Sequence, residues 1–193
     1  MGLRKALAHT VMHLSRWTFA PEFPLPDRCL VIGAPHTSNW DGFYMVMAMW
    51  AVERPVSFLV KKNLTDVPVI GSFVKAIGGI PVDREHPGHL VDHIISLAES
   101  KEHFVLVITP KGTRSVRPYW KSGFYRIAME ADLPIVPGFI DGAKRRYGWG
   151  EPMRLTGNRR NDMDKIRDFY SGLVGIRPEN TSVPRLRHED PED

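Results

Sequence analysis

Hydrophobic and polar positions change their period several times along this chain. Short apolar runs with the length of buried strands occupy residues 29–34, 56–61, 79–82, 103–109 and 134–140. Helix-like patterns lie between them, at residues 41–53, 66–77, 88–101 and 120–132. Strands that alternate with helices need crossover connections. The pattern therefore predicts an α/β domain with a mainly parallel central sheet flanked by helices.

The N-terminal segment has the pattern of an amphipathic helix. Apolar side chains of residues 3–17 fall on one stripe with basic groups around it: Leu3, Leu7, Val11, Leu14 and Trp17. Such a helix suits either a lipid interface, with Trp17 as an aromatic anchor, or packing against its own domain. We assign residues 1–20 to this helix, 21–176 to the main domain and the acidic, proline-bearing residues 177–193 to a flexible tail.

Charge and composition narrow the location and the partners. The net charge of +4 and the pI near 9.3 indicate an anionic partner, such as lipid headgroups, nucleic acid or phosphorylated metabolites. The single cysteine, Cys29, excludes an intrachain disulfide framework and fits a reducing compartment. No run reaches the roughly 18 apolar residues of a spanning helix, and basic residues interrupt the N-terminal stripe. We expect a cytoplasmic protein with peripheral membrane association.

Polar clusters follow three of the expected strands. His36 follows the first strand, Asp83 and Arg84 follow the third, and residues 110–115 follow the fourth. Ligands of parallel sheets bind beyond the carboxyl ends of the strands. We therefore expect these clusters to meet at one edge of the sheet.

Four segments carry a resemblance to a known family. "PHTSNWD", "GGIPVDRE", "TPKGTRS" and "IVPGF" occur in this order between about residues 30 and 140. Together they resemble the four blocks of the glycerolipid acyltransferases, the 1-acyl-sn-glycerol-3-phosphate acyltransferase family, whose first block is His-x4-Asp. That spacing alone is common by chance, and the order of all four blocks makes the pattern specific.

The resemblance implies a fold and a reaction. The fold would be a glycerol-3-phosphate acyltransferase-like single domain. The reaction would move a fatty acyl group from acyl-CoA or acyl-carrier protein to a hydroxyl of a lysophospholipid, such as 1-acyl-glycerol-3-phosphate. His36 would take the proton of the attacking hydroxyl, and Asp41 would hold the other ring N–H and stabilise the imidazolium. No covalent acyl-enzyme and no cofactor is needed.

The second and third blocks imply an acceptor-binding region. Arg84 matches the position that engages the acceptor's phosphate in this family, and a planar guanidinium suits that contact. The third block offers a glycine turn with backbone N–H groups, a hydroxyl and a guanidinium, suited to a phosphate or a developing oxyanion: Lys111, Gly112, Thr113 and Arg114. Lys111 replaces the family's usual glutamate. A non-phosphate lipid or glycolipid acceptor therefore stays open beside the lysophospholipid.

Other constellations offer rival functions. His86, His89 and His93 have zinc-like spacing but lack the intervening glutamate of zincins, so we expect no metal. Cys29 lies seven residues before His36 in one strand, over about 20 Å away, which argues against a Cys-His acyl-enzyme. The remaining alternative is a non-catalytic module that binds anionic membrane through basic residues such as those at 144–146, followed by two aromatic residues. We expect no nucleic-acid partner.

Overall fold

The computed structural model describes residues 2–82 and 87–189. Its strands are β1 (Thr18–Phe19), β2 (Arg28–Ala34), β3 (Ser57–Lys61), β4 (Gly79–Val82), β5 (Phe104–Ile108), β6 (Ile135–Asp141) and β7 (Arg146–Trp149). Its helices are α1 (Leu3–Ser15), α2 (Trp40–Ala51), α3 (Lys62–Thr65), α4 (Ile70–Ala76), α5 (Pro87–Glu99), α6 (Gly123–Glu130), α7 (Arg159–Tyr170) and the short 3₁₀ helix η1 (Pro178–Asn180).

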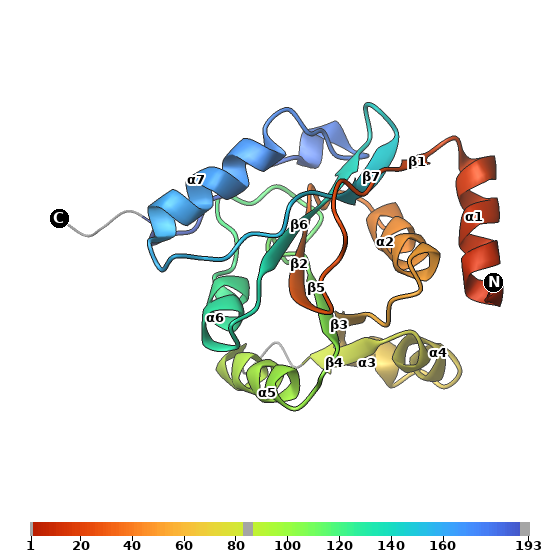
Figure 1. The fold of residues 1–193 in the computed structure, drawn as a ribbon, viewed down its shortest axis with the longest axis horizontal. Coiled ribbons are helices and arrows are strands. Elements are labelled where there is room, and N and C mark those ends of the chain that lie inside the picture. Colours follow the sequence, from red (N-terminus) through yellow and green to blue (C-terminus); the bar gives the residue numbers. More distant parts are fainter. Residues whose placement is uncertain (1, 83–86, 190–193) are drawn as a thin grey trace.

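The strands of the described residues form one sheet in the order β1-β7-β6-β2-β5-β3-β4. Neighbours from β6 to β4 run parallel, β7 runs antiparallel to β6, and β1 runs parallel to β7. The expectation of an α/β domain with a mainly parallel sheet is confirmed. Because β2 lies in the centre, the residues after its carboxyl end stand in the middle of one edge (Figure 1).

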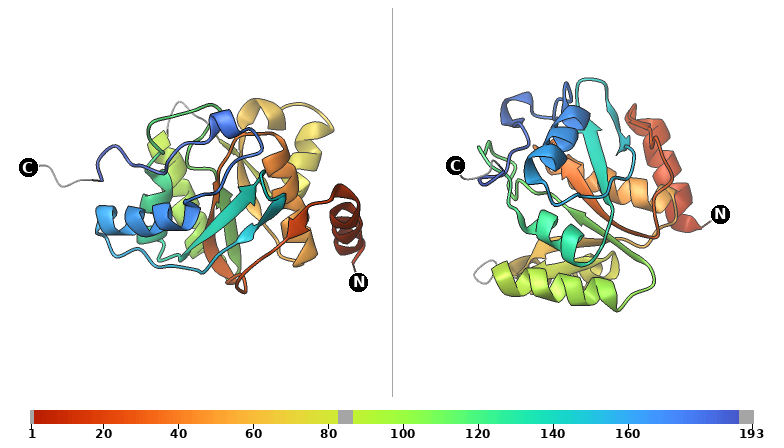
Figure 2. Two further views of the ribbon diagram at one scale, coloured as in Figure 1. Left: turned by 90° about the horizontal axis from the view of Figure 1, so that it is seen from above. Right: turned by 60° about the vertical axis from the view of Figure 1, so that its left-hand side comes forward.

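Alternating side chains of the central strands build two hydrophobic cores. Leu30 and Ile32 of β2 face a core completed by α5, α6 and α7, while Cys29 and Val31 face a core completed by α2. Helix α1 lies outside α2, and its Ala8 is buried together with Met47 and Ala51 of α2 (Figures 1 and 2). Helices therefore cover both faces of the sheet, and its carboxyl edge is left for the loops.

The helix expected at 66–77 is wrong in its extent. Within that range only α4 is helical, and residues 66–69 separate it from the short helix α3, which ends before the range begins. Pro68 cannot donate a backbone hydrogen bond, and Val69 has a left-handed φ of 65°. An uninterrupted helix cannot include a residue with that conformation.

The C-terminal residues differ from the expected loose tail as far as they are described. Leu186 and Glu189 are buried, and the backbone N–H of Trp120 donates to the carbonyl of Arg185 at 2.7 Å. The Glu189 carboxylate accepts from Arg167 and from the backbone of Leu186. The segment packs because one leucine and one paired carboxylate fix it to α7 and to the residues before α6.

Candidate active site

The first sequence block brings His36 and Asp41 together beyond the end of β2. Nδ1 of His36 lies 3.0 Å from Oδ2 of Asp41, and both side chains are largely buried, at 13% and 8% exposed. The two atoms are as close as in an ion pair. The geometry is not that of a hydrogen bond, and Nδ1 has no hydrogen-bond partner among the described residues. The imidazole thus turns one nitrogen to a carboxylate and Nε2 away from it.

Local backbone geometry fixes the Asp41 carboxylate. Asp41 lies in the first turn of α2, and its Oδ2 accepts hydrogen bonds from the backbone N–H groups of Thr37 at 2.7 Å and Ser38 at 2.8 Å. A helix N-terminus also favours negative charge. The turn from β2 to α2 therefore holds the Asp41 carboxylate against the histidine.

The third block reaches the same site through Lys111. Its side chain is 5% exposed, and its Nζ donates to the carbonyl oxygen of Asn180 at 2.7 Å. Burial lowers the pKa of Lys111, and the negative charge of Asp41 opposes that shift. Because β2 and β5 are parallel neighbours, the loops that carry Asp41 and Lys111 leave the same edge of the sheet.

The rest of the third block forms the expected turn. Gly112 has a left-handed φ of 67°, and its N–H donates to the carbonyl of Thr109 at 2.9 Å. Arg114 is exposed, while Thr113 is half-buried. Arg84 lies outside the described residues, so its expected place beside the acceptor stays a prediction. The structure pairs His36 with Asp41, buries Lys111 on the loop after the neighbouring strand β5, and leaves Arg114 exposed on that loop.

A family model described as "Acyltransferase" matches residues 19–141, which contain β2, the His36–Asp41 pair and the third block. The chain belongs to the acyltransferase family. The match ends at the last residue of β6, before β7 and α7.

Three curated relatives of the chain carry the name 1-acyl-sn-glycerol-3-phosphate acyltransferase. The chain is 27% identical over 179 residues to that of Streptococcus pneumoniae, covering 87% of this chain and 64% of that protein. It is 33% identical over 118 residues to that of Bacillus subtilis (60% and 57% covered) and 31% identical over 113 residues to that of Cocos nucifera (55% and 35% covered). The chain thus spans about a third to just under two thirds of these relatives' length.

A solved structure shares the fold. The crystal structure of the 1-acyl-sn-glycerophosphate (LPA) acyltransferase PlsC from Thermotoga maritima matches with a TM-score of 0.61 and 13% identity, covering 89% of this chain and 80% of that chain. At this identity the likeness concerns the fold. The glycerol-3-phosphate acyltransferase-like architecture expected from the four blocks is therefore supported independently of the motifs.

The site contains residues that sequence patterns missed. Thr37 is fully buried, and its Oγ1 accepts from the backbone N–H of Arg177 at 3.1 Å. With the contact between Lys111 and Asn180, this places residues after α7 against both site loops. Only the Gly-rich, Pro-bearing composition around Gly172 and Gly175 hinted at an ordered turn there, and no motif connected it to the site.

The aromatic residues of the cluster after β6 are not at the surface, although Lys144 and Arg145 are exposed. Tyr147 and Trp149 are buried in the core beside α2. Arg146 lies over the Phe139 ring, and its Nε is 3.6 Å from the buried carboxylate of Asp141. Stacking on nucleic-acid bases would require the two aromatic rings at the surface.

The rival metal and cysteine sites gain no support. His86 lies outside the described residues, and within the described part no group of three or more His, Cys, Asp or Glu side chains is arranged to hold a metal. Cys29 is fully buried in β2, and burial raises its pKa to about 12. A thiol with that pKa is no nucleophile near neutral pH.

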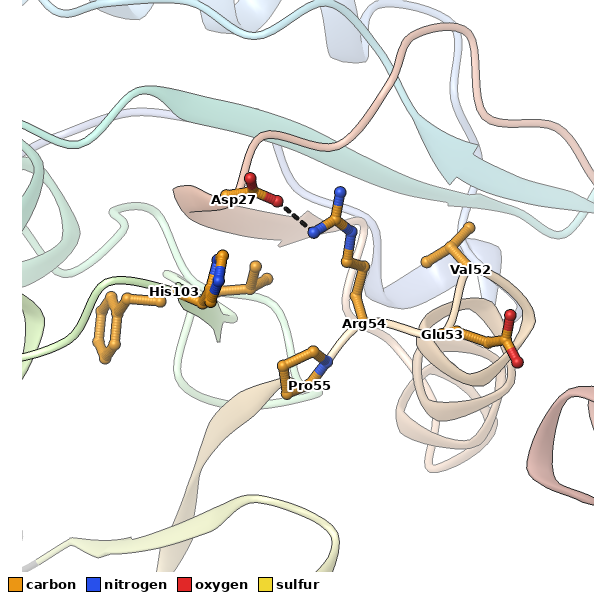
Figure 3. Close-up of a pocket in the computed structure, with 8 residues that line it drawn as sticks. Asp27, Val52, Glu53, Arg54, Pro55 and His103 are labelled. Atoms are coloured by element: carbon orange, nitrogen blue, oxygen red, sulfur yellow. Dashed lines mark hydrogen bonds and ion pairs between the residues drawn. The ribbon is translucent and has the colours of Figure 1, made fainter. Parts of the chain in front are cut away.

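A cavity of about 440 Å³ lies at the opposite end of the sheet (Figure 3). Asp27 and Arg54 point toward one another across it as an ion pair, and His103 lines it beside the start of β5. Asp27 precedes β2, whereas His36 follows that strand. The cavity therefore lies at the other end of β2 from the His36–Asp41 pair.

Proposed function

We propose that the protein is an O-acyltransferase that moves a fatty acyl group from an acyl thioester to a hydroxyl of a lysophospholipid. The observation that carries this proposal is the His36–Asp41 pair, held at 3.0 Å by two backbone N–H groups at the carboxyl edge of the sheet. The names of the relatives suggest 1-acyl-glycerol-3-phosphate as the acceptor. Acyl-CoA and acyl-carrier protein are both suitable donors.

His36 acts as the general base in this reaction. Nε2 takes the proton from the acceptor hydroxyl as its oxygen attacks the thioester carbonyl, because a neutral hydroxyl is a poor nucleophile. Asp41 fixes the ring and stabilises the imidazolium. The C–S bond then breaks, and the imidazolium returns its proton to the departing thiolate. These reaction steps involve only the two substrates and the His36–Asp41 pair.

The third block provides charge around this centre. Arg114 is exposed on the loop after β5, and Gly112 turns the backbone there, so the loop can present a guanidinium and N–H groups to an anionic group. Arg84 would add a second guanidinium after β4. An acceptor that carries a phosphate satisfies both, which favours it over an uncharged lipid or a glycolipid.

The outer surface of α1 supports peripheral attachment to an anionic membrane. Leu3 is 86% exposed, Leu14 is 74% exposed and Leu7 is exposed between them, while Ala8 and Met12 pack inward. The helix contains Arg4 and Lys5 and no acidic residue. Trp17 does not extend this surface, since it stacks on Tyr44 at 4.4 Å. No helix within the described residues is long and apolar enough to cross a bilayer.

A second apolar surface lies on the α3–α4 connection, which follows the carboxyl end of β3. Val69 is 80% exposed and Phe73 is 59% exposed, with Val67 and Ile70 exposed beside them. Exposed apolar patches in soluble domains mark interaction sites. An enzyme with lipid substrates gains from a lipid-facing patch near its catalytic edge, so we assign this surface to the same membrane.

Thiol release tests the proposal directly. Purified protein is mixed with an acyl-CoA or an acyl-carrier protein thioester and with 1-acyl-glycerol-3-phosphate, and free thiol and acylated product are both measured. Acceptor-dependent release is expected. If neither donor yields acylated product while vesicle binding persists, the protein is a membrane-binding module and the proposed reaction is wrong.

A further inference from the structure

Residues 174–181, here named the C-terminal strap, run between α7 and the last described residues. The strap is anchored at its start, where Gly142 N–H donates to the carbonyl of Val174 at 2.7 Å. It is closed internally by the bond from Gly175 N–H to Thr181 Oγ1 at 3.1 Å. Thus it is an ordered loop with its own hydrogen bonds.

Two contacts join the strap to the two loops of the site. Arg177 N–H donates to Thr37 Oγ1, beside His36, and Asn180 accepts from Lys111, in the third block. The fit is close, because a methyl group on Gly175 would come within 2.4 Å of the Thr37 side chain. The strap therefore lies directly against the turn that carries the catalytic pair.

The buried amino group explains why a lysine suits position 111. Its Nζ faces a strap carbonyl at 2.7 Å and experiences the charge of Asp41. A glutamate here would place a second carboxylate near Asp41 and would have no proton to give to Asn180. Lys111 is only 5% exposed, and its amino group already donates to Asn180. We therefore assign its charge a role within the protein and not in direct contact with the acceptor.

We propose that the strap is one wall of the acceptor site, that Lys111 is its positioning residue, and that Arg177 is the cation it presents to the acceptor's anionic group. This inference rests on the proposed acyl transfer. The backbone of Arg177 is bonded to the residue next to His36, and its side chain is exposed. A guanidinium in that position can bind a phosphate while the acceptor hydroxyl reaches His36.

The first experiment separates charge recognition from folding. Arg177→Gln is compared with Arg187→Gln, which removes the same charge from an exposed position further along the chain. For 1-acyl-glycerol-3-phosphate, we expect Arg177→Gln to raise KM about tenfold with kcat within about twofold. For the uncharged monoacylglycerol, KM should stay unchanged. Equal effects of the two variants, or an equal effect on both acceptors, would overturn the role of Arg177.

The second experiment tests Lys111 without relying on turnover. Lys111→Met removes the donor to Asn180 and keeps a long side chain, and amide hydrogen exchange is followed at Gly175, Arg177 and Thr181. Exchange should accelerate at least tenfold in the strap and remain slow in β2. If Lys111→Met fails to fold, Thr181→Val takes its place. This variant removes the acceptor of Gly175 N–H and should also accelerate exchange in the strap.

The outcomes distinguish this inference from the proposed function. If the wild-type protein acylates no acceptor, the proposed function fails, while faster strap exchange in Lys111→Met still supports the positioning role. If transfer is normal and strap exchange is unchanged in both Lys111→Met and Thr181→Val, the positioning role is wrong. A KM increase for the phosphate acceptor in Lys111→Met, with kcat retained, would connect the strap to acceptor binding.

Discussion

The hydroxyl of Tyr170, at the end of α7, lies 2.6 Å from the carbonyl oxygen of Ile32 in β2 and 3.0 Å from that of Gly138 in β6. Burial raises the pKa of Tyr170 well above its ordinary value, so the phenol keeps its proton and can donate. The contact ties α7 to the two strands whose carboxyl ends border the candidate site.

Removing this hydroxyl should destabilise the protein. We expect Tyr170→Phe to lower the free energy of unfolding by about 1–3 kcal/mol, since it leaves buried carbonyl groups short of a donor. Urea denaturation of the two proteins measures the difference. A value within error of zero would show that other groups satisfy these carbonyls.

Catalysis should depend on both members of the His36–Asp41 pair. His36→Ala is expected to abolish nearly all acceptor-dependent thiol release, because no base then takes the hydroxyl proton. Asp41→Asn is expected to reduce kcat by several orders of magnitude, as loss of the orienting carboxylate does in serine hydrolases. Circular dichroism checks that each variant is folded. A folded His36→Ala protein with near-normal release would contradict the mechanism.

Membrane attachment should depend on the exposed leucines of α1. Replacing Leu3, Leu7 and Leu14 by Ser should reduce sedimentation with phosphatidylglycerol vesicles several-fold, because their apolar area no longer enters the interface. Deletion of residues 1–18 should release the protein further, and added salt should weaken binding of the intact chain. Met129→Ser, at an exposed position of α6, is the matched control.

The α3–α4 surface can be tested in the same assay. Val69, Ile70 and Phe73 are changed together to Ser, and vesicle binding is measured beside the α1 variant. If both variants lose binding, the two surfaces meet one bilayer. If the triple variant of the α3–α4 surface binds vesicles as well as the wild-type protein does, that surface contacts another partner.

Cys29 should resist modification in the folded protein. Since burial raises its pKa to about 12, the thiol stays neutral at pH 8, where an exposed cysteine is partly ionised. Maleimide labelling should therefore be slow in buffer and fast in urea. Fast labelling in buffer, followed by loss of thiol release, would reopen the cysteine mechanism.

Much of the fold follows from local sequence patterns. The continuous apolar runs of β2, β5 and β6 predict buried strands, because a strand covered on both faces has little room for polar residues. The short strands β1 and β7 have no such run. β7 pairs with the adjacent β6 as a hairpin, and β1 forms by pairing with β7 across more than a hundred residues of sequence. Helix α7 is largely polar, and only four of its residues are buried: Asp162, Met163, Ile166 and Tyr170.

The sequence alone determined the proximity of His36 and Asp41, because five residues across a strand-to-helix turn leave the two side chains within reach of one another. It also predicted that the loops after β2 and β5 meet, since parallel neighbours end at the same edge. Only the tertiary structure decided that Lys111 donates to the backbone carbonyl of Asn180. That contact joins residues 69 positions apart. No local propensity encodes such a pairing, which depends on how the segment after α7 packs back onto the sheet.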